Sequence, residues 1–338
     1  MKNKLMIKKM IKNRKFLIGV SIISSLFMMS CSSDDDDYER GNWVTRSVFD
    51  GIPRSNAVAF TIGDNGYMGT GYDGDDYLQD FWEYDTEGNY WVQKADFPGA
   101  ARSAGVGFTI DDKGYVGTGY SGITELSDFY EYDPATNTWE RKADFLGGVR
   151  REALGFGVDG KGYIGTGYDG KNDKKDFYKY DPATDEWSEL VGFGGDKRKS
   201  ATSFTIDNVV YIGTGISNGL YKYDFWEFNP ETEVFTRKND LNEDDDYQVA
   251  RYNAVGFELQ GLGYIAAGYS GGASSTIWEY DPLADTWEEI TSLEGTSRED
   301  AVSFSTGERA YVLMGKSGTL YLDDIYELFP QQEYDDED

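Results

Sequence analysis

An internal repeat dominates this chain and limits what it can fold into. One unit recurs about every 48 residues, and an arginine opens it six times with a phenylalanine six residues later. The arginines are Arg54, Arg102, Arg150, Arg198, Arg251 and Arg298, and the phenylalanines are Phe60, Phe108, Phe156, Phe204, Phe257 and Phe304. A period of roughly 20 to 50 residues indicates a stacked or circular array of small units.

Each unit has the pattern of four short strands. In the second unit, residues 106–110 alternate large and small side chains, and an Asp-Lys-Gly turn leads into the second strand, Tyr-Val-Gly-Thr-Gly. The third strand, residues 128–132, ends at Asp133-Pro134, where proline favours a turn and removes a ladder donor. A tryptophan-containing fourth strand follows. Four strands without a helical period predict the blade of a β-propeller.

The first and last units complete each other. The chain has six arginine openings but only five complete endings after them, the last around Trp287. Trp43 lies 48 residues before Trp91, the spacing that also separates Trp91 from Trp139. We therefore expect an all-β, six-bladed propeller over residues 42–330 in which the N-terminal strand completes blade 6 and removes open sheet edges.

The repeat resembles kelch repeats over residues 42–330. The shared features are a strand ending in glycine, an arginine before the next blade, and a Tyr-Asp turn, followed by proline in three of four cases, with Tyr and Trp seven residues apart. These pairs are Tyr84/Trp91, Tyr132/Trp139, Tyr180/Trp187 and Tyr280/Trp287. The paired glycines of the family appear as Gly-Thr-Gly in blades 1 to 4 but only the second is kept at Gly268 and Gly315. The resemblance implies a galactose-oxidase-like propeller that binds ligands around the channel mouth; it leaves the function open, because such propellers include oxidases, epimerases and binding modules.

The N-terminus predicts export and lipidation. Residues 1–15 hold seven Lys and Arg and no acid, and an apolar run from Phe16 to Met29 is too short to span a bilayer well. The run ends at Cys31, the only cysteine, in a sequence that resembles a bacterial lipobox. We therefore expect a lipoprotein signal peptide at 1–30, a lipid anchor on Cys31 and an acidic tether at 31–41. An ordinary signal peptide cut beside a spare thiol is the alternative.

The residues that follow Cys31 predict where the protein is located. Residues 32–37 resemble the serine and acidic signal of Bacteroidetes lipoproteins, which implies a lipid-anchored protein exposed on the outer membrane surface. Residues 331–338 form an acidic C-terminal tail. A short acidic run is also typical of a solvated tether.

Composition excludes several function classes. Without the leader, 25 Lys and Arg face 61 Asp and Glu, a net charge of −36, so nucleic acid and anionic membrane surfaces are poor partners. The chain has no histidine and only one cysteine, so the usual zinc, copper and haem sites and the Ser-His and Cys-His nucleophiles are not available. We expect no cofactor and a monomeric propeller.

Strand alternation predicts where a ligand binds. The second-to-third-strand loops and the fourth-to-first-strand loops emerge at one end, together with the six opening arginines, and the tight Asx-Gly and Asp-Pro turns lie at the other. We expect the arginines mainly to bond carbonyls or acids of adjacent blades, with ligand contact secondary, since unpaired cations would repel one another. Four tyrosines after the glycine, Tyr72, Tyr120, Tyr168 and Tyr269, fit either blade packing or stacking platforms.

Residues that break the repeat are the better ligand candidates. The positions after the opening arginine carry charges in blades 3, 4 and 6 and an aromatic in blade 5, namely Arg151, Glu152, Lys199, Tyr252, Glu299 and Asp300. Glu152 and Asp300 lie three blades apart and should face each other across the axis. They fit either an acid/base pair or, as we favour, ion pairs with Arg150 and Arg298.

Two further features remain open. Residues 73–76 and 169–173 carry aspartates that fit either solvated turns, as we favour, or a calcium site. About five extra residues near 242–246 lengthen the connection from blade 4 to blade 5 and should extend the mouth-side rim.

These observations predict a cell-surface binding module that recognises a glycan or a protein at the channel mouth. A metal-free carbohydrate-active enzyme such as a sugar mutarotase or epimerase, and a structural part of an outer-membrane complex, are the alternatives.

Overall fold

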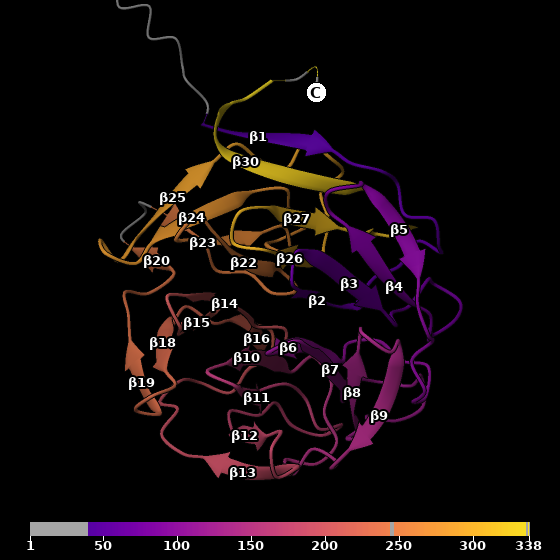
Figure 1. Cartoon of the computed structure of the whole chain (residues 1–338). Helices are drawn as coiled ribbons and strands as arrows, with labels where there is room; N and C mark the ends of the chain where they lie inside the picture. The colour runs from indigo at the N-terminus through magenta and orange to yellow at the C-terminus, as the bar shows by residue number, and fades with distance from the viewer. Residues whose placement is uncertain (1–39, 244–246, 336, 338) are drawn as a thin grey trace, which may run out of the picture. The chain divides into compact units, whose positions relative to one another are not determined.

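The propeller is built entirely from β-strands in the described part of the chain. The structure, a computed structural model, describes residues 40–243, 247–335 and 337. These residues form six four-stranded antiparallel sheets arranged in a ring (Figure 1) and no helix that is long and apolar enough to cross a membrane. The predicted signal peptide, Cys31 and most of the predicted tether lie outside the described residues. The predicted all-β, six-bladed propeller is confirmed.

Each blade is one meander of consecutive strands. Blade 1 comprises β2 (Val58–Ile62), β3 (Asn65–Gly69), β4 (Phe81–Asp85) and β5 (Tyr90–Gln93), and blade 2 comprises β6 (Val106–Ile110), β7 (Lys113–Gly117), β8 (Phe129–Asp133) and β9 (Thr138–Lys142). Blade 3 comprises β10 (Leu154–Val158), β11 (Lys161–Gly165), β12 (Phe177–Asp181) and β13 (Glu186–Leu190), and blade 4 comprises β14 (Thr202–Ile206), β15 (Val209–Gly213), β18 (Trp226–Asn229) and β19 (Val234–Arg237). Blade 5 comprises β22 (Val255–Leu259), β23 (Leu262–Ala266), β24 (Ile277–Asp281) and β25 (Thr286–Ile290).

Blade 6 joins the two ends of the propeller. Its strands β26 (Val302–Ser305), β27 (Ala310–Leu313) and β30 (Ile325–Glu333) are completed by β1 (Arg40–Thr45), which pairs with β30 from Thr45↔Tyr326 to Arg40↔Glu333. The closure predicted from Trp43 is therefore confirmed. Pairing extends two residues before and three beyond the expected limits of 42 and 330, because β30 is long enough to keep pairing with β1.

Aromatic rings pack the blades against one another. A Cβ placed on Gly114 of β7 would lie 2.3 Å from the ring of Phe60, on the first strand of the preceding blade. The same ring-on-glycine contact joins Phe108 to Gly162, with 2.7 Å. A side chain at these glycines would collide with a rigid ring, so the repeated glycine and phenylalanine form one packing unit.

The Tyr and Trp of the kelch-like turn form cross-strand pairs. Tyr132 and Trp139 are paired residues of β8 and β9 with ring centroids 4.9 Å apart, and the hydroxyl of Tyr132 donates to Asn137 at 2.9 Å. Aromatic pairs of this kind stabilise a fold beyond the area they bury. The spacing of seven residues thus reflects a two-strand turn held by its own side chains.

Three of the loops contain a short two-stranded hairpin. They are β16 (Ile216–Ser217) with β17 (Leu220–Tyr221), β20 (Asn242–Glu243) with β21 (Tyr247–Gln248), and β28 (Lys316–Ser317) with β29 (Leu320–Tyr321). The β20–β21 hairpin accounts for the extra residues between blades 4 and 5. It lies against β25, the outermost strand of blade 5, so it extends the periphery and not the edge of the channel.

Candidate functional site

The six opening arginines are part of the framework. Their side chains are at most 1% exposed, and five of them pair with an aspartate of the same blade. Arg102, for example, donates to both carboxylate oxygens of Asp128 at 2.6 and 2.7 Å and to the carbonyl of Thr118 at 2.8 Å. The other pairs are Arg54–Asp80, Arg150–Asp176, Arg198–Asp224 and Arg298–Asp324.

This geometry corrects the expected partners of the arginine side chains. The bonded acids belong to the arginine's own blade, not to the adjacent one, because Arg and Asp lie 26 residues apart at the mouth ends of the first and third strands. Burial alone would raise the pKa of Asp80, but the hydrogen bonds and charge of Arg54 outweigh burial and lower it. With their guanidinium groups buried and bonded, the six arginines are not available to a ligand.

The arginine main chain, in contrast, joins neighbouring blades. Gly119 donates its N–H to the carbonyl of Arg150 at 2.6 Å, and Gly315 donates to Arg54 at 2.9 Å. Both glycines have a positive φ, 100° and 93°, and a Cβ on Gly119 would lie 2.8 Å from the carbonyl oxygen of Ser103. This explains why the second glycine is kept in every blade while the first is replaced in blades 5 and 6.

A closed ring of main-chain hydrogen bonds surrounds the channel. The second residue after each opening arginine donates its N–H to the carbonyl of the equivalent residue in the preceding blade, over 2.9 to 3.3 Å. All six have a left-handed backbone with φ between 51° and 56°. They are Asn56, Ala104, Glu152, Ser200, Asn253 and Asp300. Because each residue is bonded on both sides, the ring fixes how its side chains are presented to the channel.

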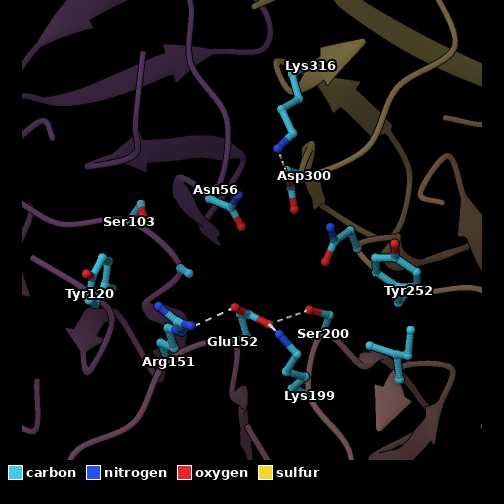
Figure 2. Close-up of a pocket in the computed structure, with 13 residues that line it drawn as sticks. Asn56, Ser103, Tyr120, Arg151, Glu152, Lys199, Ser200, Tyr252, Asp300 and Lys316 are labelled. Atoms are coloured by element: carbon cyan, nitrogen blue, oxygen red, sulfur yellow. Dashed lines mark hydrogen bonds and ion pairs between the residues drawn. The ribbon is translucent and has the colours of Figure 1, made fainter. Parts of the chain in front are cut away.

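A polar pocket lies in the channel mouth, and these ring residues line it. Its volume is about 260 Å³, and Arg151, Lys199, Tyr120, Tyr252 and Lys316 complete much of its wall. Figure 2 shows Glu152 and Asp300 entering the pocket from opposite sides. The expectation that the charges of blades 3, 4 and 6 meet at one end of the channel agrees with this arrangement.

Glu152 is held in an ionic network on one side of the pocket. Its carboxylate lies 2.6 Å from the ammonium of Lys199 and 3.4 Å from Nε of Arg151, and it accepts a hydrogen bond from Ser200 at 3.1 Å. The guanidinium of Arg151 also lies 3.6 Å from Glu125. The predicted partner, Arg150, is wrong: its side chain turns into the blade toward Asp176, whereas Arg151 and Lys199 face the channel.

Asp300 occupies a different environment on the other side. Its side chain is only 4% exposed and lies 3.0 Å from the ammonium of Lys316, while the predicted partner Arg298 is bonded to Asp324. Burial raises the pKa of Asp300 to about 6, although the charge of Lys316 opposes the rise. For Lys316, burial lowers the pKa, but the charge and the hydrogen bond of Asp300 outweigh burial, so that the pKa of Lys316 is raised. Burial therefore makes the carboxylate of Asp300 harder to ionise than that of an exposed aspartate.

Aromatic rings form much of the rim. The guanidinium of Arg151 lies over the rings of Tyr120 and Tyr168, 4.8 and 5.0 Å from their centroids. The ring centroid of Tyr252 lies 5.1 Å from that of Tyr269, on which it stacks, and 5.9 Å from that of Tyr221.

The remaining rings continue this rim along blades 6, 1 and 2. Tyr72 contacts Tyr77 and Tyr321, with centroids 4.9 and 6.1 Å apart. The four predicted tyrosines are thus half-buried rim residues that contact other rings or a cation.

The sequence missed several residues of this site. Lys316 and Ile216 occupy the position where the other blades carry the rim tyrosine, so their departure from the repeat was the available signal. Tyr77, Glu125 and Tyr321 lie in second-to-third-strand loops that differ in sequence between blades, and nothing local marks them. Glu299 was predicted and accepts a hydrogen bond from Asn253 at 2.9 Å, but it does not line the pocket.

The aspartate-rich loops bond to themselves. Asp73 accepts the N–H groups of Asp75 and Asp76, and Asp169 accepts those of Lys171 and Asn172 and pairs with Lys174 at 3.0 Å. Within residues 40–243 and 247–335, no group of three or more His, Cys, Asp or Glu side chains is arranged to hold a metal ion.

Comparison with known proteins agrees with the fold. The Kelch motif model matches residues 250–294, which span blade 5 from Ala250 to Glu294. No curated protein sequence matches the chain. Among solved structures, the one described as "Structure of YjhT" aligns over 82% of this chain and 95% of that chain at 17% identity, with a TM-score of 0.71. At that identity the likeness concerns the fold alone. The chain is a six-bladed, all-β propeller that carries a Kelch motif.

Proposed function

We propose that the protein is a binding module that holds a glycan segment in the mouth pocket. The observation that carries the proposal is a pocket of both charge signs bordered by tyrosine rings. Hydroxyl-rich sugars need donors and acceptors together, which Arg151, Lys199, Glu152 and Asn253 supply, and the flat rings offer apolar faces with a polar edge. A Kelch-type propeller fold is suited to binding in general; the glycan is the specific part of the proposal.

The pocket is suited to recognition because it is built in advance. The six-membered main-chain ring fixes its floor, and ion pairs orient Glu152 and Lys199 before a ligand arrives. Preorganised groups lose little conformational freedom on binding, which favours affinity. A ligand that replaces one partner of these ion pairs must supply an equivalent group, so the site should select for the pattern of hydroxyl and charged groups on the sugar.

A glycan array probed with residues 38–338, which form one compact unit, tests this function. The same array with Glu152→Gln and Arg151→Ala should lose the bound glycans while both variants unfold at the wild-type temperature, because half-exposed charges add little to stability. Wild-type binding by both variants, together with loss of binding after substitutions at the Asp133-Pro134 turn, would place the site at the other end of the channel.

We further propose that the module is anchored through Cys31 at the outer membrane surface. The propeller begins at Arg40, and β1 runs as a fourth strand from the turn end toward the mouth. Cys31→Ser should move the protein from the membrane fraction to the soluble fraction; an unchanged membrane fraction would refute lipidation at this residue.

A metal-free sugar mutarotase or epimerase is the second candidate. It is favoured by the contrast between ion-paired Glu152 and buried Asp300 with its raised pKa, because acid/base chemistry needs one group that donates and one that accepts a proton. Time-resolved NMR of sugar anomers identified on the array would show faster interconversion with the wild type than with Asp300→Asn. Equal rates for the two proteins would leave binding as the function.

A further inference from the structure

A second surface beside the pocket combines exposed cations with exposed aliphatic side chains. It lies on the mouth-side loops of blades 3 and 4 and on the loops that lead into them. We call it the basic aliphatic sector and define it by Leu146, Lys171, Lys175, Val191, Lys197 and Leu220, all of which are exposed. The pocket and the sector share no residue.

The sector is unusual in charge for this protein. The whole chain has 61 acids against 32 cations, yet the ammonium groups of Lys171, Lys175 and Lys197 form no ion pair within the described residues. Two nearby acids are ion-paired, Asp169 with Lys174 and Asp196 with Lys222, and Asp173 accepts a hydrogen bond from the hydroxyl of Ser217. Residues 169–176, 191–199 and 216–224 hold seven Lys and Arg against five Asp, so these loops carry a small net positive charge on a strongly acidic molecule.

Its apolar members are large and well exposed. Val191 is 76% exposed, Leu220 67% and Leu146 59%, and most of the other exposed large apolar side chains in the described residues also lie on mouth-side loops. Exposed apolar groups that gather on one face, and not singly, mark interaction surfaces. Burying them against a partner would be favourable by the hydrophobic effect.

Internal bonds hold the loops of the sector together. Lys174 and Arg198 form a β-bridge that joins the blade 3 loop to the connection into blade 4. The Asp173–Ser217 and Lys222–Asp196 contacts join both segments to the blade 4 loop. These contacts connect the loops that carry Lys171, Lys175, Val191, Lys197 and Leu220.

We propose that the basic aliphatic sector docks an acidic polypeptide segment of a partner protein that carries interspersed apolar residues. Charge complementarity selects an anionic partner. The apolar members decide the class: branched aliphatic side chains pack against leucine and valine, whereas sugars favour flat aromatic rings, which lie around the pocket and not in this sector. The protein would thus hold a glycan in its pocket and a partner protein beside it.

Fluorescence anisotropy with defined probes tests the proposal on the full chain in detergent. The probe is a labelled peptide that repeats Leu-Glu-Glu, and a peptide that repeats Ser-Glu-Glu has the same charge without the apolar residue. We expect the first peptide to bind more tightly. Its binding should weaken about tenfold in Lys171→Glu/Lys175→Glu/Lys197→Glu and by a similar factor in Leu146→Ser/Val191→Ser/Leu220→Ser.

Matched controls lie at the opposite end and in the pocket. Lys113→Glu/Lys161→Glu changes cations near the turns, Leu283→Ser changes an apolar residue that is 97% exposed on an Asp-Pro turn, and Glu152→Gln changes the pocket. All three variants should bind the Leu-Glu-Glu peptide like the wild type. Because Glu152→Gln changes only the pocket, the peptide test can fail or succeed independently of the glycan test.

Three results would overturn the proposal. One is no binding of the Leu-Glu-Glu peptide. Another is equal binding of both peptides with no effect of the aliphatic substitutions, which would make the sector a general polyanion site. The third is binding of vesicles with anionic lipids that depends on the same six residues, which would identify a lipid surface as the partner.

Discussion

Arg251 donates a hydrogen bond to the main-chain carbonyl of Thr276 at 3.1 Å, at the position where the other five blades place an aspartate beside the opening arginine. It also bonds the carbonyls of Val249 and Ala267 at 2.9 Å, so its donors are partly satisfied, but within the described residues it forms no ion pair, and only the more distant charge of Glu289 opposes the effect of burial. Burial therefore lowers the pKa of Arg251 to about 10.

Restoring the aspartate should stabilise blade 5. Thr276→Asp places a carboxylate next to a buried guanidinium, as in the Arg102–Asp128 pair, and we expect a gain of about 1 to 3 kcal/mol in the free energy of unfolding at neutral pH. Urea unfolding measures this, with Thr276→Asn as the uncharged control. A Thr276→Asp protein no more stable than Thr276→Asn would show that main-chain carbonyls already satisfy Arg251.

In the main-chain ring, Ala104 has a left-handed backbone but no polar side chain that could offset its conformational cost. Its φ is 52°. Ala104→Gly should raise the free energy of unfolding by about 0.5 to 1 kcal/mol, because glycine adopts this conformation without a Cβ clash. Ala57→Gly, at a neighbouring position without a positive φ, should lower it by a similar amount. The opposite order in thermal unfolding would contradict the strain.

Closure of the ring depends on Trp43. Its side chain is fully buried in the cluster between blades 5 and 6, and its indole N–H donates to the carbonyl of Thr291 at 3.3 Å. Trp43→Ala should cost about 3 to 5 kcal/mol and favour aggregation through the weakened β1 edge. The exposed neighbour substitution Val48→Ala should cost little. Calorimetry with light scattering measures both, and a wild-type melting temperature for Trp43→Ala would mean that closure of blade 6 does not depend on the side chain of Trp43.

Asp300 should make stability depend on pH. Its pKa rises from 3.8 when unfolded to about 6 in the fold, so between these values the folded state binds more protons and stability falls as pH rises. Relative to Asp300→Asn, the wild type should lose about 2 kcal/mol between pH 4 and pH 6 and change little above pH 7. Denaturant unfolding of both proteins over this range tests it. A difference that grows in the opposite direction would show that Lys316 keeps Asp300 ionised in the fold.

Much of the fold is visible in the repeat. The six arginine–phenylalanine openings predicted six blades, and the 48-residue interval between Trp43 and Trp91 predicted the closing strand. Strand alternation also placed Arg151, Glu152, Lys199 and Asp300 at one end of the channel, where they line one pocket. These features follow from sequence because hydrogen bonding and packing within a blade use residues at fixed offsets.

The partners of the charged residues depended on the tertiary structure. Sequence proximity suggested Arg150 for Glu152 and Arg298 for Asp300, but those arginines point into their own blades. Lys199 comes from the next blade, and Lys316 lies beside Asp300 only because residues 299 and 316 pair across a bridge. The direction of a side chain, toward the blade interior or toward the channel, decides which pair forms.

The sequence by itself determined the number of blades, the closing strand and the end of the channel that carries the charges. The tertiary structure alone decided the closed main-chain ring, the burial of Asp300 and the exposure of Lys171, Val191 and Lys197 on one connected surface. The physical reason is that a repeat encodes contacts within and between successive blades, whereas burial and charge compensation sum over loops that are distant in the chain and differ from blade to blade.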